Sequence, residues 1–134
     1  MTALVNENWF WLGRLYGGAT YGIRINAADT FGGSIVNGNA GRNVFFSGDI
    51  EGLADEGVAV YFHNSSCNVI MDSRCEEGYG SKSIVLSGEC FGNEINLSTI
   101  KLNEVDFSGM NTPNSRPNIL KSARLSTGQY SAGI

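Results

Sequence analysis

The sequence predicts an all-β protein in which short strands wind into a stacked coil. Its 134 residues are rich in Gly, Asn and Ser, with 18 glycines and only two prolines. This composition favours short strands joined by tight turns over a bundle of helices. Apolar residues also recur in pairs two positions apart, the spacing of a strand with one buried face. These pairs return at intervals that add up to about 25 residues, which is the mark of a repeated structural unit.

The repeat is clearest in three asparagines. Asn43, Asn68 and Asn93 are equally spaced at this interval, and each stands just before an expected strand. Because one unit of this size cannot bury its own apolar side, neighbouring units must stack on a shared core. We therefore predict a short parallel β-helix of about three to four turns over residues 21–110. Its strands are expected at Ile23/Ile25, Gly33/Ile35, Val44/Phe46, Val58/Val60, Val69/Met71, Ile84/Leu86, Ile95/Leu97 and Val105/Phe107.

The segments on either side are expected to cap or attach the coil. Residues 1–20 form the N-terminal cap or attachment segment, and residues 111–134 form a C-terminal extension. Apolar residues at nearly helical spacing predict a short capping helix within residues 2–16, with Thr2 as its N-cap. The alternative is an extended segment, because Trp9 and Trp11 also alternate.

The N-terminal segment holds the densest group of aromatic residues. We expect this group to fill a capping core. The functional alternatives are a platform for sugars and contact with a partner protein, and we favour the partner contact of these two because Trp and Tyr anchor interfaces. The interface candidates are Trp9, Trp11 and Tyr16. Phe45, Val58 and Ile70 are expected as apolar residues on the surface, where packing against further copies of the chain would cover them.

An antiparallel β-sandwich, such as a carbohydrate-binding module, is the alternative architecture. Eight short strands at this spacing also suit a sandwich. However, short and long steps between strands alternate along the middle of the chain, a pattern that a sandwich has no reason to maintain. Two-residue hairpin turns are also scarce, since only Asn37-Gly38 has the expected sequence.

Charge and composition exclude several kinds of partner and cofactor. The formal net charge is −4 and the nine Lys and Arg residues are scattered, so we expect no binding to nucleic acid or to a membrane surface. No apolar run approaches the roughly 18 residues of a membrane-spanning helix, and no secretory signal is visible. Cys67, Cys75 and Cys90 match neither a disulfide framework nor a zinc motif, and we expect three small buried side chains. We expect no metal and no cofactor.

Residues 21–109 resemble the right-handed parallel β-helices of the pectate-lyase type. The matching features are the length of the repeat and the recurring Asn43, Asn68 and Asn93. In that family, stacked asparagines at a tight turn form a hydrogen-bonded ladder, and the resemblance implies this role for the three asparagines. Asparagine also tolerates the left-handed backbone conformation that such turns can require.

Within that family, the acidic and Gly/Asn/Ser-rich chain is most similar to bacteriophage tailspikes and tail fibres. This resemblance implies a structural and host-recognition module of a virion, folded in the host cytoplasm and assembled as a homotrimer. Its implied partners are bacterial surface polysaccharide and other virion proteins.

The alternative function is that of a hydrolase or lyase that degrades polysaccharide. Paired carboxylates about 5 to 10 Å apart can act as acid and base or nucleophile on a glycosidic bond. The acids of this chain lie in Gly-flanked turns, where solvated carboxylates are ordinary, so we expect no enzyme. His63 follows Phe62 at the end of a strand and is expected to be a turn residue without a catalytic partner. The catalytic candidates are Asp49, Asp72 and Glu76, and the sugar-binding candidates are Glu51, Arg74, Glu77 and Tyr79.

Overall fold

The computed structural model describes residues 7–15, 20–27, 30–31, 34–35, 40–46, 48–51, 53–75, 82–100, 104–111, 116–125 and 131–133. These residues form an all-β structure and include no α-helix. The strands are β1 (Trp9–Trp11), β2 (Arg14–Leu15), β3 (Tyr21–Asn26), β4 (Thr30–Phe31), β5 (Ser34–Ile35), β6 (Ala40–Gly41), β7 (Val44–Phe46), β8 (Asp49–Ile50), β9 (Val58–His63), β10 (Ser65–Ser66), β11 (Val69–Cys75), β12 (Lys82–Gly88), β13 (Glu94–Ile100), β14 (Val105–Met110), β15 (Ile119–Leu125) and β16 (Ser131–Gly133).

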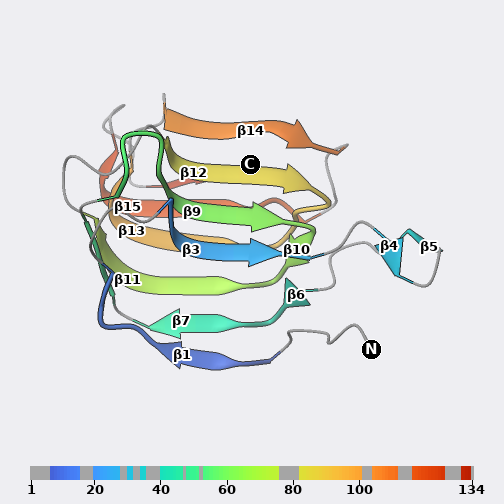
Figure 1. Cartoon of the computed structure of the whole chain (residues 1–134), viewed down its shortest axis with the longest axis horizontal. Coiled ribbons are helices and arrows are strands. Elements are labelled where there is room, and N and C mark those ends of the chain that lie inside the picture. The colour runs from blue at the N-terminus through green and yellow to red at the C-terminus, as the bar shows by residue number, and fades with distance from the viewer. Residues whose placement is uncertain are drawn as a thin grey trace.

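Most of these strands pair in parallel and form a curled sheet arrangement. One sheet has the order β1-β7-β11-β13-β15-β16, with β8 joined to β11 and β2 joined to β8. A second sheet has the order β14-β12-β9-β3, and its strands run against the direction of β1 and β7 (Figure 1). The expectation of an all-β chain is therefore confirmed. The antiparallel sandwich is wrong, because both of these sheets are built chiefly from parallel pairs.

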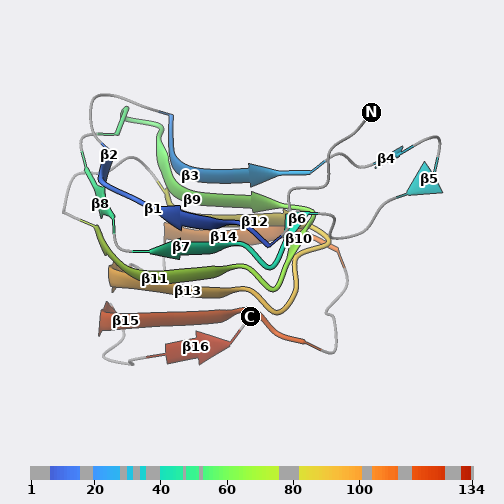
Figure 2. The same cartoon turned by 90° about the horizontal axis from the view of Figure 1, so that it is seen from below.

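The register of the first sheet repeats at the interval that separates the three asparagines in the sequence. Phe45 lies opposite Ile70, Ile70 opposite Ile95, and Ile95 opposite Leu120. Figure 2 shows the strands that carry these residues side by side. The sequence interval between Phe10 and its partner Phe45 is longer than the interval in these pairs. Within it, the chain between β3 and β6 contains the antiparallel pair β4–β5. The strand expected at Gly33/Ile35 is therefore wrong as a member of the stack, because β5 turns back onto β4 beside it (Figure 1).

The core consists of columns in which each side chain packs on its counterpart in the next strand. Ile23, Val60 and Ile84 form such a column in the second sheet, and they share one apolar cluster with Ile70 and Ile95 of the first. The inner faces of the two sheets therefore cover one another. This is the arrangement that lets units too small to fold alone exclude water together.

The inward and outward sides of β7 and β11 are reversed from our expectation. Phe45, Val58 and Ile70 were expected on the surface and are buried. Val44–Phe46 and Val69–Met71 are apolar at three successive positions, so alternation alone cannot tell which side faces inward. The buried Asn43 and Asn68 show which side faces inward, because Phe45 and Ile70 follow them by two positions and therefore point the same way.

The helix expected within residues 2–16 is also wrong for the part of this segment that the structure describes. Trp9–Trp11 and Arg14–Leu15 are strands that pair in parallel with β7 and β8. The alternation of Trp9 and Trp11 was the better guide, because pairing satisfies the backbone groups and places Phe10 on Phe45 with ring centroids 4.9 Å apart. Strands of the first sheet thus lie within both flanking segments, with β1 at one end of the sheet and β15 followed by β16 at the other.

A column of five asparagines marks one corner of the stack. Each side-chain amide contacts the next, with Oδ1 of one asparagine accepting bonds from both the backbone N–H and Nδ2 of its neighbour at 2.8 to 3.2 Å. At the far end, Nδ2 of Asn118 donates to the carbonyl of Cys90. The three asparagines that the resemblance singled out are central members. The complete column is Asn8, Asn43, Asn68, Asn93 and Asn118.

The left-handed backbone at this corner falls one residue before each of the first four asparagines, whereas Pro117 precedes Asn118. Glu7, Arg42, Cys67 and Gly92 have φ values of 59°, 56°, 55° and 63°. We had linked the tolerance of asparagine for this conformation to the ladder positions themselves, and that link is wrong. The asparagines are needed here for their amides, which satisfy backbone donors at the turn that no strand partner reaches.

We expect Asn68→Ala to destabilise the protein by about 3 kcal/mol. The substitution removes the acceptor for two donors of Asn43 in a buried position, and each such loss costs about 1 to 3 kcal/mol. Urea unfolding would measure the change. Asn26→Ala, at an exposed position in β3, is the matched control and should change the free energy of unfolding by less than about 0.5 kcal/mol. Equal effects of the two substitutions would contradict a stabilising role for the column.

Candidate functional site

The outer aromatic face is the main apolar surface among the described residues. We define it as Trp9, Trp11, Phe46 and Met71, which project from β1, β7 and β11 on the side away from the core. Trp9 and Trp11 are 69% and 77% exposed. Trp11 stacks on Phe46 at 4.3 Å with the ring planes only 13° apart, and Trp9 meets the same ring at 5.7 Å. Register places Met71 beside Phe46.

These positions show that the expected capping core is wrong for the two tryptophans. Only Phe10 points inward, where it covers the end of the column that begins with Phe45. Because side chains alternate along a strand, inward packing of Phe10 forces both neighbouring tryptophans outward. Tyr16, the third interface candidate, lies outside the described residues.

The same outer surface carries polar groups on the strands that follow, with Ile119 of β15 as an exposed apolar residue among them. Register places Glu94 beside Val69, and Asn96 beside Lys121 one strand further on. Nζ of Lys121 lies 2.6 Å from Oε1 of Glu94, so their charges are paired. One continuous sheet therefore carries aromatic rings on its first strands and hydrogen-bonding groups on its later ones.

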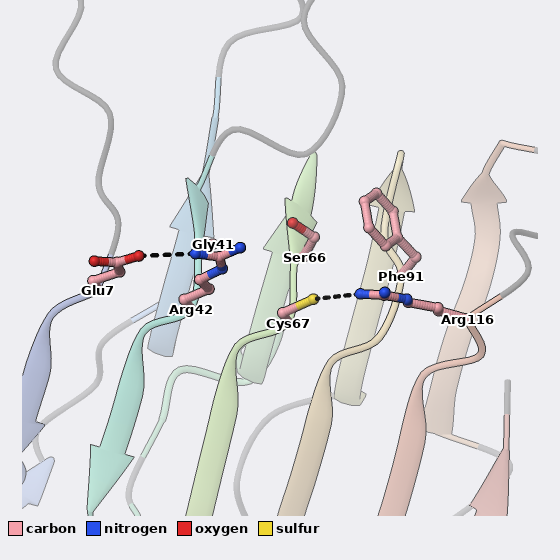
Figure 3. Close-up of a pocket in the computed structure, with 7 residues that line it drawn as sticks. All are labelled: Glu7, Gly41, Arg42, Ser66, Cys67, Phe91 and Arg116. Carbon is pink, nitrogen blue, oxygen red and sulfur yellow. Dashed lines mark hydrogen bonds and ion pairs between the residues drawn. The ribbon is translucent and has the colours of Figure 1, made fainter.

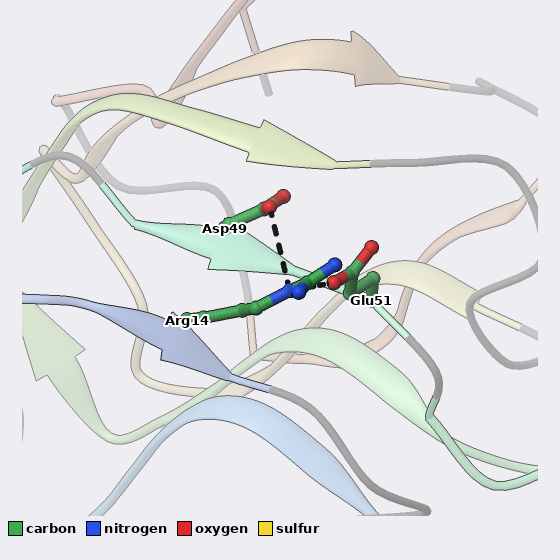
Figure 4. A network of polar contacts seen from close by, with 3 residues as sticks. All are labelled: Arg14, Asp49 and Glu51. Carbon is green, nitrogen blue, oxygen red and sulfur yellow. Dashed lines mark hydrogen bonds and ion pairs between the residues drawn. The ribbon is translucent and has the colours of Figure 1, made fainter.

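Two of the acidic candidates meet at a single arginine (Figure 4). Arg14 of β2 forms an ion pair with Glu51, and its Nε lies 3.9 Å from Oδ2 of Asp49. The carboxyl group of Glu51 is mostly buried, whereas Arg14 is exposed. Parallel pairing explains the meeting, because Arg14 lies directly opposite Asp49 and Arg74 continues the same row. Arg14 was not among our candidates, although it precedes Asp49 by the same interval that separates the first two asparagines of the column.

This arrangement suits a crosslink between strands better than an acid–base pair. Both carboxylates face one guanidinium, which links β2 to β8 and to the residue that follows β8. Oδ1 of Asp49 is buried and has no hydrogen-bond partner. Arg74 lies beside Asp49 in the register, as the repeat spacing predicts.

The remaining candidates cannot be placed by their side chains. Asp72 lies within β11, but its side chain is outside the described part of the structure. Glu76, Glu77 and Tyr79 lie outside the described residues altogether.

A hollow of about 410 Å³ lies at the corner just before the asparagine column (Figure 3). It is lined in part by Arg42, Cys67 and Arg116. Nη1 of Arg116 lies 4.0 Å from Sγ of Cys67, and the arginine reaches it across Gly92, where a Cβ atom would lie 3.3 Å from that sulfur. Cys67 is a free, half-exposed thiol, so our expectation of a buried side chain is wrong for this cysteine.

The second sheet carries a polar contact that sequence reasoning missed. Nδ1 of His63, the last residue of β9, lies 2.8 Å from Oγ of Ser87 on β12. His63 is therefore not a turn residue without a partner. On β14, Asp106 accepts bonds from the hydroxyl and the backbone N–H of Ser108, at 2.7 and 3.0 Å. These bonds hold the pKa of Asp106 below its ordinary value, with a smaller contribution from Lys82.

Within the described residues, no group of three His, Cys, Asp or Glu side chains could hold a metal ion. The same part of the chain contains no helix long and apolar enough to cross a membrane. Comparison with family models, curated protein sequences and solved structures found no match to this chain.

We expect Arg14→Ala to cost about 1 kcal/mol of stability, because Glu51 is then left as a mostly buried carboxylate without its cation. Urea unfolding would measure this cost. Amide exchange should also quicken at the N–H of Glu51, which donates to the carbonyl of Leu15. Arg42→Ala is the matched control, because its ion pair with Glu7 is exposed at both ends and should contribute almost nothing. A larger loss in Arg42→Ala would show that the Arg14 cluster is not the crosslink we describe.

Proposed function

We propose that the chain is a short right-handed parallel β-helix that serves as a structural and host-recognition module of a phage tailspike or tail fibre. The repeating register and the asparagine column support the coil. The outer aromatic face carries the proposal of recognition, with bacterial surface polysaccharide as the ligand. Placement in a virion, beside other virion proteins, rests on the resemblance of the sequence.

The aromatic face suits a sugar because its rings are exposed and held in place. A pyranose ring presents a flat apolar surface of C–H groups, which packs on an aromatic ring and loses contact with water. Trp11 is supported from behind by Phe46, so little side-chain freedom remains to be lost when a ligand stacks on it. Trp9 lies two residues away on the same strand, about 7 Å along the chain, which places a second ring beside the first.

The polar part of the same surface favours a polysaccharide over an apolar partner. Sugars carry hydroxyl groups around their edges, and Asn96, Lys121 and Glu94 offer donors and acceptors on the neighbouring strands. An apolar partner would match the aromatic residues of the first three strands and Ile119 of β15, but not the charged and amide groups beside Ile119. A glycan chain that crosses the sheet would meet aromatic rings and then hydrogen-bonding groups.

The alternative of a hydrolase or lyase has less support in the described residues. Such an enzyme needs two carboxyl groups that hold and release protons on either side of a glycosidic bond. Asp49 and Glu51 are instead joined through Arg14. Recognition without cleavage of the glycosidic chain is therefore the function that we propose.

We expect replacement of both Trp9 and Trp11 by Ala to weaken polysaccharide binding by at least about tenfold, because two stacking rings are lost. The measurement is binding to immobilised capsular polysaccharide and lipopolysaccharide from a panel of bacteria. Phe107→Ala is the control, since Phe107 is an exposed aromatic residue on the other sheet. If no polysaccharide binds the wild-type chain, or if the control weakens binding equally, the proposal for this face fails.

We also expect the protein to assemble as a homotrimer. The end of the stack at β1 leaves Phe10 38% exposed at the end of a core column, so a further copy would gain by covering it. Sedimentation equilibrium at micromolar concentration should give three times the 14.4 kDa mass of one chain. A stable monomer would contradict the trimer. If the double tryptophan variant dissociates a wild-type trimer, the outer aromatic face is a subunit contact and not a glycan site.

A further inference from the structure

The outer surface of the second sheet carries a row of small and polar residues in register. Asn26 lies opposite His63, His63 opposite Ser87, and Ser87 opposite Gly109. Both His63 and Ser87 are partly exposed. The row contains the single histidine of the sequence. It is separate from the outer aromatic face, which belongs to the first sheet.

Within this row, a hydroxyl and an imidazole are placed as a nucleophile and its base require. Oγ of Ser87 lies 2.8 Å from Nδ1 of His63, within reach for direct proton transfer. The hydroxyl of Tyr61 lies 3.4 Å from the same oxygen. Oγ carries one proton, and the shorter contact favours its donation to Nδ1, with the ring proton of His63 on Nε2.

Two glycines make room for this pair. A Cβ atom at Gly88 would lie 3.0 Å from Cε1 of His63 and would overlap Oδ1 of Asn64, so the imidazole sits in space that only glycine leaves open. Gly88 also has a φ of 63°, which few other residues adopt. On the other side of the serine, a Cβ atom at Gly109 would lie 3.1 Å from Cβ of Ser87. The absent side chain leaves Ser87 uncovered on that side.

The ring of Tyr61 is also held in place. Its neighbour Tyr21 lies 5.3 Å away by ring centroids, and the guanidinium carbon of Arg24 lies 4.7 Å from the Tyr21 ring and 5.6 Å from the Tyr61 ring. Cation–π contacts of this kind fix the rings and leave a positive charge nearby. The Tyr61 hydroxyl is therefore held in place beside Oγ of Ser87, the oxygen that would attack.

We propose that Ser87 is the nucleophile and His63 the general base of a site that hydrolyses small O-acyl esters. Gly109 places no side chain beside Ser87, and Ser87 is partly exposed, so a small acyl group can approach Oγ from solvent. That such a group would be carried by a polysaccharide rests on the proposed function. The ester chemistry itself rests only on the pair and its surroundings.

The reaction balances with water as the co-reactant. Oγ of Ser87 bonds to the carbonyl carbon while its proton passes to Nδ1 of His63. The ester C–O bond then breaks, and the departing alcohol takes the proton from His63. Water next attacks the acyl-serine, giving its proton to His63, and the carboxylic acid leaves as Ser87 recovers its proton.

The test uses the intact chain with two probes that contain no sugar. A fluorophosphonate should form a phosphonyl ester at Ser87 with loss of fluoride, which peptide mapping by mass spectrometry would locate. p-Nitrophenyl acetate should be hydrolysed with release of nitrophenolate. Ser87→Ala should abolish both reactions, and His63→Gln should slow both by at least about tenfold.

Two further variants keep the test independent of folding defects. Gly109→Ala should slow both reactions by crowding Ser87, while its circular dichroism and unfolding midpoint report whether the fold is kept. Ser108→Ala removes an exposed serine of β14 that contacts Asp106 and no histidine, and it should leave both rates unchanged. Labelling spread over several serines, or labelling of Ser87 that is unaffected by His63→Gln, would overturn the proposal.

These outcomes separate the ester site from glycan recognition. If the wild-type chain hydrolyses the acetate ester but binds no polysaccharide, the proposed function fails and the ester site stands. If polysaccharide binds and Ser87 stays unlabelled, the ester site fails and the proposed function stands.

Discussion

The hydrogen bonds along the asparagine column are the constraint on which the rest of the structure depends. A buried amide must be paired, and in this column its partner is the amide of the neighbouring repeat. That partner is in reach only if each repeat adds one strand at the usual spacing, about 4.8 Å, and brings the next asparagine to the same corner. The length of each repeat is thereby fixed. The additional residues between Asn8 and Asn43 cannot be absorbed within such a repeat, and this stretch contains the hairpin β4–β5 beside the stack.

A fixed register also decides what the outer surfaces present. A shift of one residue would exchange the inward and outward sides of every strand, and would bury Trp9 and Trp11 while exposing Phe10. The outer aromatic face exists because inward packing of Phe10 on Phe45 leaves its neighbours no other direction. On the second sheet, the same register aligns His63, Ser87 and Gly109, which lie far apart in the sequence. The packing of the core side chains sets the register, and the register determines which residues each outer surface presents.

The sequence could predict the repeat, but it could not predict for every strand which side faces the core. The equal spacing of three asparagines and the apolar pairs correctly indicated an all-β chain with stacked neighbours. Asn118 continues the same spacing and could have been found, whereas Asn8 was hidden by the longer first step. The inward side of Val44–Phe46 could not be read, since an apolar triplet has no alternation. The partners Arg14 and Ser87 were missed for a related reason. Their contacts depend on which strands pair, and the unequal spacing of the strands along the sequence hides the pairing.

The two outer surfaces belong to sheets whose inner faces share one core, so they point away from each other. A sugar stacked on Trp11 is therefore remote from Ser87 of the same chain. A polysaccharide, however, is long enough to extend beyond the face that first holds it. In the homotrimer that we propose, a glycan held by the tryptophans of one copy would reach the serine of the next wherever the second sheet of one chain lay beside the aromatic face of its neighbour. Binding and acyl removal would then become properties of the assembly, although the residues proposed for each site lie within one chain.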